Sequence, residues 1–250
     1  MANGPETSIL SYFRDARFAV LLFLIGALML AVPFIGAVDI RGKSGLPEIT
    51  LGLLFGSMLL SAAYAAARSR ASRIAAWCLL APLILIWLVD LATGPNSVAI
   101  ARHLLSIVFV GYVILLIFGH LFATERVTVN TIAASLCIYF LIAIVWADFY
   151  SIMEIANPGS FIVTSGDTPD VPLQVGGEGT AMALYYSLVT LTTLGYGDIV
   201  PKTAPARMFA AMEAVTGQMY LAVLVARLVG MHIVHSRHRT GEPDNGDRGQ

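Results

Sequence analysis

The chain has 250 residues, of which 57% are hydrophobic and 12% are charged, and its mean hydropathy is +0.77. Soluble domains carry about twice this fraction of charged residues, so the composition excludes an ordinary soluble domain and leaves room for several membrane spans. The net charge of −1 argues against a nucleic-acid partner. Cys78 and Cys137 both lie inside apolar segments, which favours packing roles over a disulfide or a metal site.

Six apolar segments come close to the length of about 20 residues that a bilayer requires. They cover residues 18–38, 49–67, 74–91, 98–122, 129–150 and 206–234, and we predict a transmembrane helix for each. The first segment is too long for the apolar core of a signal peptide, and no small-residue cleavage site follows it, so it is counted as a span. A shorter helix is predicted at residues 180–192, between the fifth and sixth spans.

The distribution of basic residues orients these spans. An even number of spans places both termini on the same side of the membrane. That side receives Arg14, Arg17, Arg68, Arg70, Arg73, Arg126, Arg237 and Arg239, and the opposite side receives only Arg41, Lys43, Lys202 and Arg207. Because loops rich in basic residues stay in the cytoplasm, we predict a multi-pass protein of the cell membrane with both termini cytoplasmic.

The most informative stretch covers residues 190–198 and reads TLTTLGYGD. Gly195 and Gly197 alternate with Leu194 and Tyr196. Glycine adopts backbone conformations closed to other residues, so this alternation lets successive carbonyl groups point the same way. A ring of such strands from several chains gives stacked oxygen cages that can replace the water shell of a cation. The structural alternative is a simple glycine turn that contains the same letters.

This stretch resembles the selectivity filter of potassium channels, whose pattern is TxxTxGYG, commonly with Val or Ile before the first glycine. The residues that match are Thr190, Thr193, Gly195, Tyr196, Gly197 and Asp198, and Leu194 departs from the pattern. The resemblance covers residues 127–235 and extends to the six-transmembrane, voltage-gated-like superfamily. It implies an all-α membrane protein with six transmembrane helices, a re-entrant pore helix and a filter loop. Residues 1–126 would form a four-helix domain, residues 127–236 the pore domain, and residues 237–250 a disordered cytoplasmic tail.

The resemblance also implies a role for each residue of this stretch. K+ would be the permeant ion, without any further cofactor, and its oxygen ligands would come from Thr193, Leu194, Gly195 and Tyr196, with Gly197 closing the outer turn. The supporting residues would be Thr190, Thr192, Asp198, Tyr185, Tyr186 and Glu213. The two tyrosines either buttress the filter through a phenol hydrogen bond or make ordinary aromatic contacts. One copy per chain cannot enclose a path, so a homotetramer is expected.

Two residues of the sixth span call for separate interpretations. Glu213 lies only two turns into the membrane, where burying an unpaired carboxylate is costly. We therefore predict a neutral, hydrogen-bonded side chain behind the pore helix, with partners among backbone groups or the threonine hydroxyls of residues 190–193. Gly217 is either a gate hinge or a small residue needed for helix packing.

The remaining charged residues bear on gating. Voltage sensors of this superfamily repeat arginine along the fourth span, whereas this span contains Arg102 alone, and steep gating takes about three to four charges per subunit. His232, His235 and His238 could sense pH or a metal ion, or simply anchor a helix end in the interface. The loop 148–179 forms either an acidic outer vestibule or a plain solvated loop; its acidic residues are Asp148, Glu154, Asp167, Asp170 and Glu178.

These observations together predict a potassium-selective channel that passes K+ down its electrochemical gradient and is not steeply voltage-gated. The sequence contains no Ser-His-Asp set, metal cluster or phosphate-binding loop, so no enzymatic activity is assigned. The alternatives are a subunit of a potassium-uptake transporter, or a non-conducting membrane sensor or scaffold that uses a pore-like unit. The expected partners are potassium ions, the lipid bilayer and further copies of the chain.

Overall fold

The computed structural model describes residues 17–38, 46–66, 69–93, 98–123, 128–164, 171–172 and 177–240. Its helices are α2 (Arg17–Val38), α3 (Leu46–Ala66), α4 (Arg70–Thr93), α5 (Ala99–Phe122), α6 (Val129–Ala156), α7 (Gly177–Leu191) and α8 (Ala204–Thr240). Three short strands accompany them, namely β1 (Phe161–Val163), β2 (Val171–Pro172) and β3 (Ile199–Pro201).

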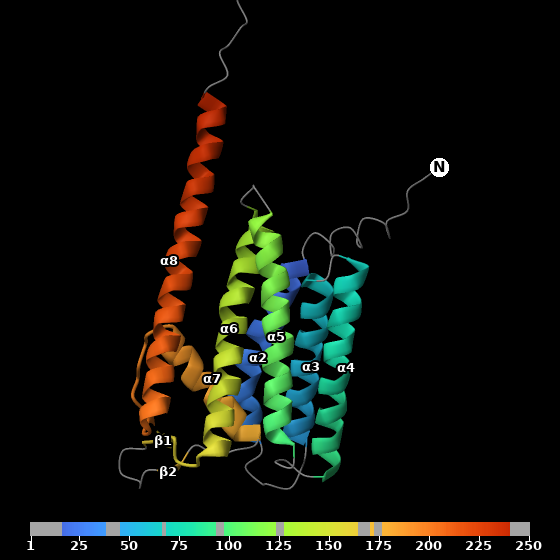
Figure 1. Ribbon diagram of the computed structural model, residues 1–250, viewed down its shortest axis with the longest axis vertical. Coiled ribbons are helices and arrows are strands. Elements are labelled where there is room, and N and C mark those ends of the chain that lie inside the picture. Colours follow the sequence, from blue (N-terminus) through green and yellow to red (C-terminus); the bar gives the residue numbers. More distant parts are fainter. Residues whose placement is uncertain are drawn as a thin grey trace, which may run out of the picture.

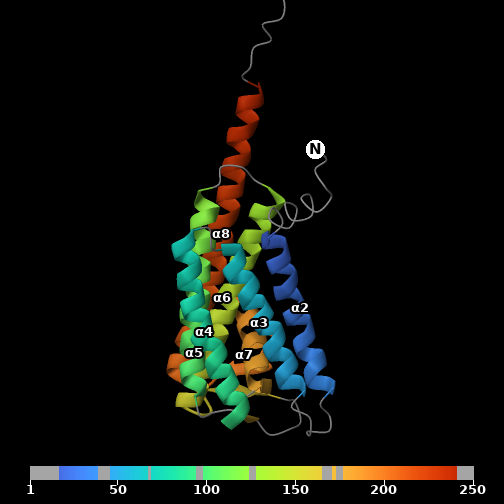
Figure 2. The same cartoon turned by 90° about the vertical axis from the view of Figure 1, so that its right-hand side faces the viewer.

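The long helices run up and down in alternating directions, and the short helix α7 lies between α6 and α8 (Figure 1). Helices α2 to α6 stand side by side as a bundle when the molecule is turned (Figure 2). The start of α2 and the end of α8 lie at the same end of the molecule, whereas the strands lie at the opposite end (Figure 1). This arrangement agrees with the sequence-based prediction that the polypeptide crosses the membrane repeatedly.

Among the described residues, four helices contain a stretch that is long and apolar enough to cross a membrane, and these stretches are Arg70–Val89, Ala99–Phe122, Val129–Ala156 and Ala204–Gly230. In α2 and α3, the stretches Arg17–Ala31 and Gly52–Ala65 are also apolar, within the part of each helix whose side chains the structure describes. The prediction of a helical membrane protein is therefore confirmed. The total of six spans and the re-entrant pore helix remain predictions.

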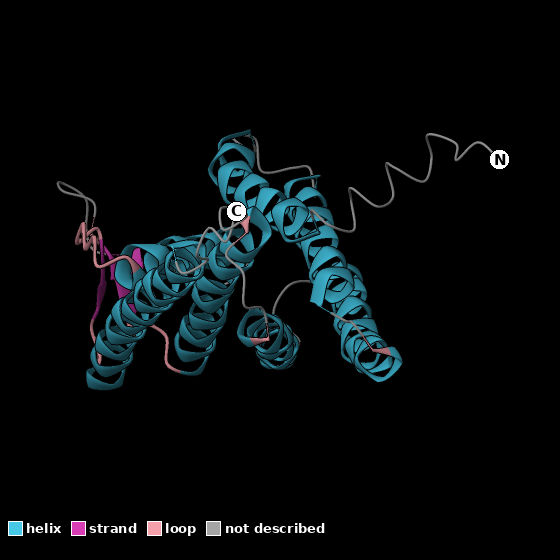
Figure 3. Ribbon diagram, turned by 90° about the horizontal axis from the view of Figure 1, so that it is seen from above, coloured by secondary structure: helices cyan, strands magenta, loops and turns pink. Residues whose placement is uncertain are grey.

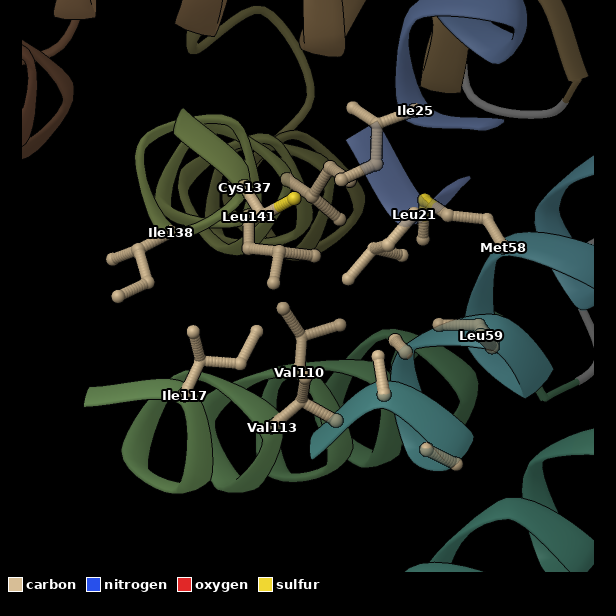
Figure 4. Close-up of a cluster of buried hydrophobic side chains, with 14 of the residues drawn as sticks. Leu21, Ile25, Met58, Leu59, Val110, Val113, Ile117, Cys137, Ile138 and Leu141 are labelled. Atoms are coloured by element: carbon tan, nitrogen blue, oxygen red, sulfur yellow. The ribbon is translucent and has the colours of Figure 1, made fainter. Parts of the chain in front are cut away.

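The main core lies where α2, α3, α5 and α6 meet (Figure 4). Leu21 of α2 and Met58 of α3 point toward Val113 of α5 and Leu141 of α6, and all four are fully buried. Helix α6 has apolar residues on every side because it packs against α2, α5, α7 and α8 at once. The pore-like segment α6 to α8 is thus packed directly against α2 and α5.

A small sheet lies beside the exit of the 190–198 stretch, at one edge of the molecule (Figure 3). Strand β1 pairs antiparallel with β2 on one side and β3 on the other, with Ile162 opposite Val200. The amide of Thr164 also donates to the Asp198 carbonyl at 2.7 Å. The sequence interpretation missed these strands because each is only two or three residues long, which is too short for an alternating pattern to be recognised.

Several helix boundaries differ from the predicted ones. Helix α6 continues to Ala156 rather than ending near Tyr150, and α7 covers Gly177–Leu191 rather than 180–192. The disordered tail was predicted from residue 237, whereas α8 remains helical to Thr240. Residues 241–250 lie outside the described residues. These differences amount to a few residues. Helices α6 and α8 extend past their predicted ends because polar residues can continue a helix after it leaves an apolar region.

Candidate functional site

The candidate filter begins at the last turn of α7 and is fastened to it by backbone hydrogen bonds. The amide of Thr193 donates to the Thr190 carbonyl at 2.9 Å, and the amide of Leu194 donates to the Val189 carbonyl at 2.9 Å. The Gly195 amide approaches the same Val189 carbonyl at 3.4 Å. The filter therefore starts where the helix dipole places its partial negative charge, which favours a cation.

Every second residue from Thr193 to Gly197 has a left-handed backbone conformation. The φ angles are 59° for Thr193, 62° for Gly195 and 81° for Gly197. Glycine enters this region without cost, whereas a side chain at the same angle is strained. The alternation of the two glycines in the sequence thus matches a backbone requirement at these two positions.

The two neighbouring tyrosines of α7 have different surroundings. The Tyr185 hydroxyl donates to Asp198 Oδ2 at 2.6 Å, and Asp198 Oδ1 accepts the amide of Ile199 at 3.1 Å. Tyr186 is instead buried in an aromatic cluster, with ring centroids 5.1 Å from Tyr150 and 5.2 Å from Phe161. Tyr185 therefore makes the phenol hydrogen bond considered from the sequence, and Tyr186 provides aromatic packing.

The two threonine hydroxyls at the start of the filter point in different directions. The Thr192 hydroxyl donates to the Leu188 carbonyl of its own helix at 2.7 Å. The Thr193 hydroxyl donates to the Thr192 carbonyl at 2.7 Å and accepts Gln218 Nε2 at 3.3 Å. Gln218 was not predicted as a site residue from the sequence. The feature that could have indicated it is a lone side-chain amide inside the apolar span, one residue after Gly217.

Glu213 is fully buried behind α7, but not with the predicted partners. Its Oε2 accepts the Tyr150 hydroxyl of α6, and its Oε1 lies 2.5 Å from the Ser187 hydroxyl of α7. The predicted partners within residues 190–193 are therefore wrong. Glu213 faces the middle of α7 rather than its end, and the threonine hydroxyls bond elsewhere.

Gly217 lies against the end of α7. A side chain at this position would overlap the carbonyl oxygen of Leu191, the last residue of that helix. The same carbonyl accepts the Tyr139 hydroxyl of α6 at 3.2 Å. Gly217 thus has a packing role, and its role as a gate hinge remains a prediction.

Two of the five acidic residues assigned to the possible outer vestibule are buried instead. Asp148 and Glu154 are buried in α6, where Asp148 Oδ1 pairs with His103 Nδ1 of α5 at 2.6 Å. Glu154 accepts the amides of Gly159 at 2.6 Å and Phe161 at 3.0 Å. These two acids therefore cannot belong to an open vestibule. The side chains of Asp167, Asp170 and Glu178 lie outside the described residues.

The residues considered for gating are Arg102 and the three histidines His232, His235 and His238. Arg102 lies near the start of α5, with Nη2 3.4 Å from the Nε2 atom of His103. The buried pair of His103 and Asp148 was not foreseen, although both are polar residues within apolar spans. The side chains of His232, His235 and His238 lie outside the described residues, so their two interpretations stay open.

Comparisons with known proteins found a channel family model over the candidate filter and several similar channel proteins. A family model described as "Ion channel" matches residues 172–232. The "Two pore potassium channel c" of Oryza sativa subsp. japonica is 36% identical over 74 residues, which is 30% of this chain and 14% of that protein. The "A-type voltage-gated potassium channel KCND3" of Homo sapiens and of Rattus norvegicus is 37% identical over 59 residues, 23% of this chain and 9% of each relative.

These likenesses are to channel proteins, two of them potassium channels, and not to enzymes. The chain spans 14% or less of the length of these curated relatives, and the family model covers residues 172–232. No solved structure matches the chain.

Proposed function

We propose that four copies of the chain form a potassium-selective pore that passes K+ down its electrochemical gradient. In this arrangement Thr193, Leu194, Gly195 and Tyr196 supply the oxygen ligands, and Gly197 closes the outer turn. Asp198, Tyr185 and Tyr186 hold the filter from behind, together with Thr190, Thr192 and Glu213. The proposal takes α7 as a re-entrant pore helix, with α6 and α8 as the outer and inner helices.

The observation that carries the proposal is the exposed backbone of the candidate filter. Within the described chain, the carbonyls of residues 194–197 accept no hydrogen bond from the backbone or from a side chain. The side chains of Leu194 and Tyr196 are 55% and 67% exposed. Unpaired carbonyls cannot face lipid, so this segment needs further protein around it and a polar ligand for its oxygens. A dehydrated cation is such a ligand.

An apolar stripe on α8 supports the assembly of several copies. Met208, Met212, Val215 and Met219 recur at helical spacing, and each is more than half exposed in the single chain. Copies arranged around one axis would bring this stripe and the filter together at the centre. Closed rotational symmetry gives every copy the same environment, which suits a path assembled from identical segments.

The proposal includes the six-span, voltage-gated-like topology, with residues 1–126 as a four-helix domain and 127–236 as the pore domain. The filter then opens at the extracellular side and both termini are cytoplasmic, consistent with the basic residues at the span ends. Because Arg102 is the one arginine of the fourth span, the proposed channel responds only weakly to voltage.

Purified protein reconstituted into potassium-loaded liposomes tests this function. A potassium-selective channel lets K+ leave passively and drives proton uptake through an added ionophore, and replacing K+ by Na+ abolishes the signal. A transporter would need a coupled ion gradient, and a scaffold would give no flux in either salt. The mass of the purified complex, measured in the same preparation, should correspond to four chains.

A further inference from the structure

Three helices meet at one buried cluster of hydroxyl and carboxyl groups behind the candidate filter. Tyr150 of α6, Ser187 of α7 and Glu213 of α8 are each 0% exposed. The Tyr150 hydroxyl bonds to Glu213 Oε2, and the Ser187 hydroxyl lies 2.5 Å from Glu213 Oε1. The same Ser187 hydroxyl lies 2.8 Å from the Ala143 carbonyl of α6.

Counting hydrogen atoms decides the protonation of this cluster. Three oxygen-to-oxygen contacts each need one hydrogen atom. The two hydroxyl groups supply two, because each has a single hydrogen, and a carbonyl supplies none. If Glu213 were ionised, Ser187 could donate to Glu213 or to Ala143 but not to both. The third hydrogen has to come from the carboxyl group of Glu213.

We propose that Glu213 is an uncharged carboxylic acid that donates to Ser187, which donates in turn to the Ala143 carbonyl, while Tyr150 donates to the other oxygen of Glu213. Within the described part of the chain, the titratable side chains that face Glu213 are the phenols of Tyr139 and Tyr150 from α6 and Tyr186 from α7. These groups are uncharged and give a carboxylate no compensating positive charge. A fully buried carboxyl group in such surroundings is far less costly as a neutral acid.

Glu154 gives a contrast within the same protein. It is also buried, at 2% exposure, but its two oxygens accept the backbone amides of Gly159 and Phe161. Amide groups only donate, so both oxygens of Glu154 act as acceptors, which is the arrangement of a carboxylate. The two buried glutamates therefore differ in charge because their partners differ in donor capacity.

As a neutral acid, Glu213 acts as a positioning residue for the filter. This part of the inference rests on the proposed function. Ser187 lies two residues before Val189, whose carbonyl holds the amide of Leu194. A chain of hydrogen bonds from α8 through Ser187 to α6 thus fixes α7 where the filter begins. Losing it would loosen the filter without removing any ion ligand.

Infrared spectroscopy of the purified protein at neutral pH tests the protonation directly. We expect a carbonyl stretching band of a protonated carboxyl group that is missing in Glu213→Gln. The matched variant Glu154→Gln should keep that band and lose intensity from the carboxylate bands. A spectrum in which Glu213→Gln leaves the protonated band intact, or a wild-type protein without the band, would overturn the proposal. This result does not depend on conduction, so it stands apart from any failure of the proposed function.

Single-channel recording tests the positioning role. Glutamine can donate to Ser187 and accept from Tyr150, so Glu213→Gln should keep the mean open time within about twofold of wild type. Glu213→Ala leaves two buried hydroxyls without their partner and should shorten openings about tenfold or more, while the preference for K+ stays. Equal damage by Gln and Ala would mean that the negative charge is needed, and would refute a neutral Glu213.

Discussion

The hydroxyl of Tyr185 donates a 2.6 Å hydrogen bond to the carboxylate of Asp198, thirteen positions further along the chain, and the whole candidate filter lies between the two residues. This bond ties the middle of α7 to the point where the chain leaves the filter. Asp198 also accepts the amide of Ile199, at the start of β3. The end of the candidate filter is therefore held from α7 and from the small sheet together.

Replacing Tyr185 by Phe should destabilise the outer end of the filter. The change removes one hydrogen bond to a charged group, worth about 1.5–3 kcal/mol, and leaves the aromatic ring in place. We expect openings to become at least several-fold shorter in single-channel recordings, with little change in the choice of K+ over Na+. Tyr64→Phe, at a tyrosine of α3 that is 70% exposed, is the matched control and should behave like wild type. Unchanged open times in Tyr185→Phe would show that the bond does not support the filter.

The glycines of the filter should not tolerate a side chain. At φ angles of 62° and 81°, alanine at position 195 or 197 costs of order 1–3 kcal/mol of backbone strain. We expect Gly195→Ala and Gly197→Ala to abolish selective K+ flux in the liposome assay while the complex still assembles. Gly111→Ala on α5, where nothing lies within 4 Å of the added carbon, is the control. Selective flux in either filter variant would remove these residues from the filter.

Substitution of Gly217 can distinguish a packing role from a hinge role. An added methyl group would overlap the Leu191 carbonyl, so Gly217→Ala should push α8 away from α7 and lower the thermal stability of the complex. A substitution at a simple hinge would alter gating and leave the melting temperature unchanged. Gly230→Ala on the same helix has open space around the new carbon and serves as the control. If both variants melt like wild type, the close contact with Leu191 is not important for stability.

Arg102 should contribute little to gating. It lies near the start of α5 beside His103, and one charge per chain gives a shallow voltage response at best. We expect the wild-type conductance to rise only gradually with voltage, and Arg102→Gln to leave that relation nearly unchanged. A steep wild-type curve that shifts strongly in the variant would show that the first four helices do sense voltage.

The long helices could be predicted because each lies in a mainly apolar segment of about 20 residues, which is a strong signal in any sequence. The filter residues stood out because Gly195 and Gly197 flank Tyr196 in a pattern with a specific backbone requirement. The strands β1 to β3 could not be predicted, because their pairing depends on the chain returning beside Asp198 and not on local composition.

The support behind the filter was predicted only in part. Burial of Glu213 followed from its depth in the sixth span. Its partners Tyr150 and Ser187 could not be predicted from the sequence, because the rotation of α8 about its axis depends on how three helices pack. The same limit applies to Gln218 and Thr193, which lie 25 residues apart in the sequence. The pairing of buried Asp148 with His103 could not be predicted for the same reason, and it shows that Asp148 does not belong to the possible acidic vestibule.

The reversal potential of the purified protein in a planar bilayer, with K+ salt on one side and Na+ salt on the other, tests the central claim most directly. A filter formed by residues 193–197 of four chains should move the reversal potential far from zero, toward the value set by K+ alone. Gly195→Ala, recorded in parallel, should lose this shift. A wild-type reversal potential near zero, with current carried equally by both ions, would contradict the account.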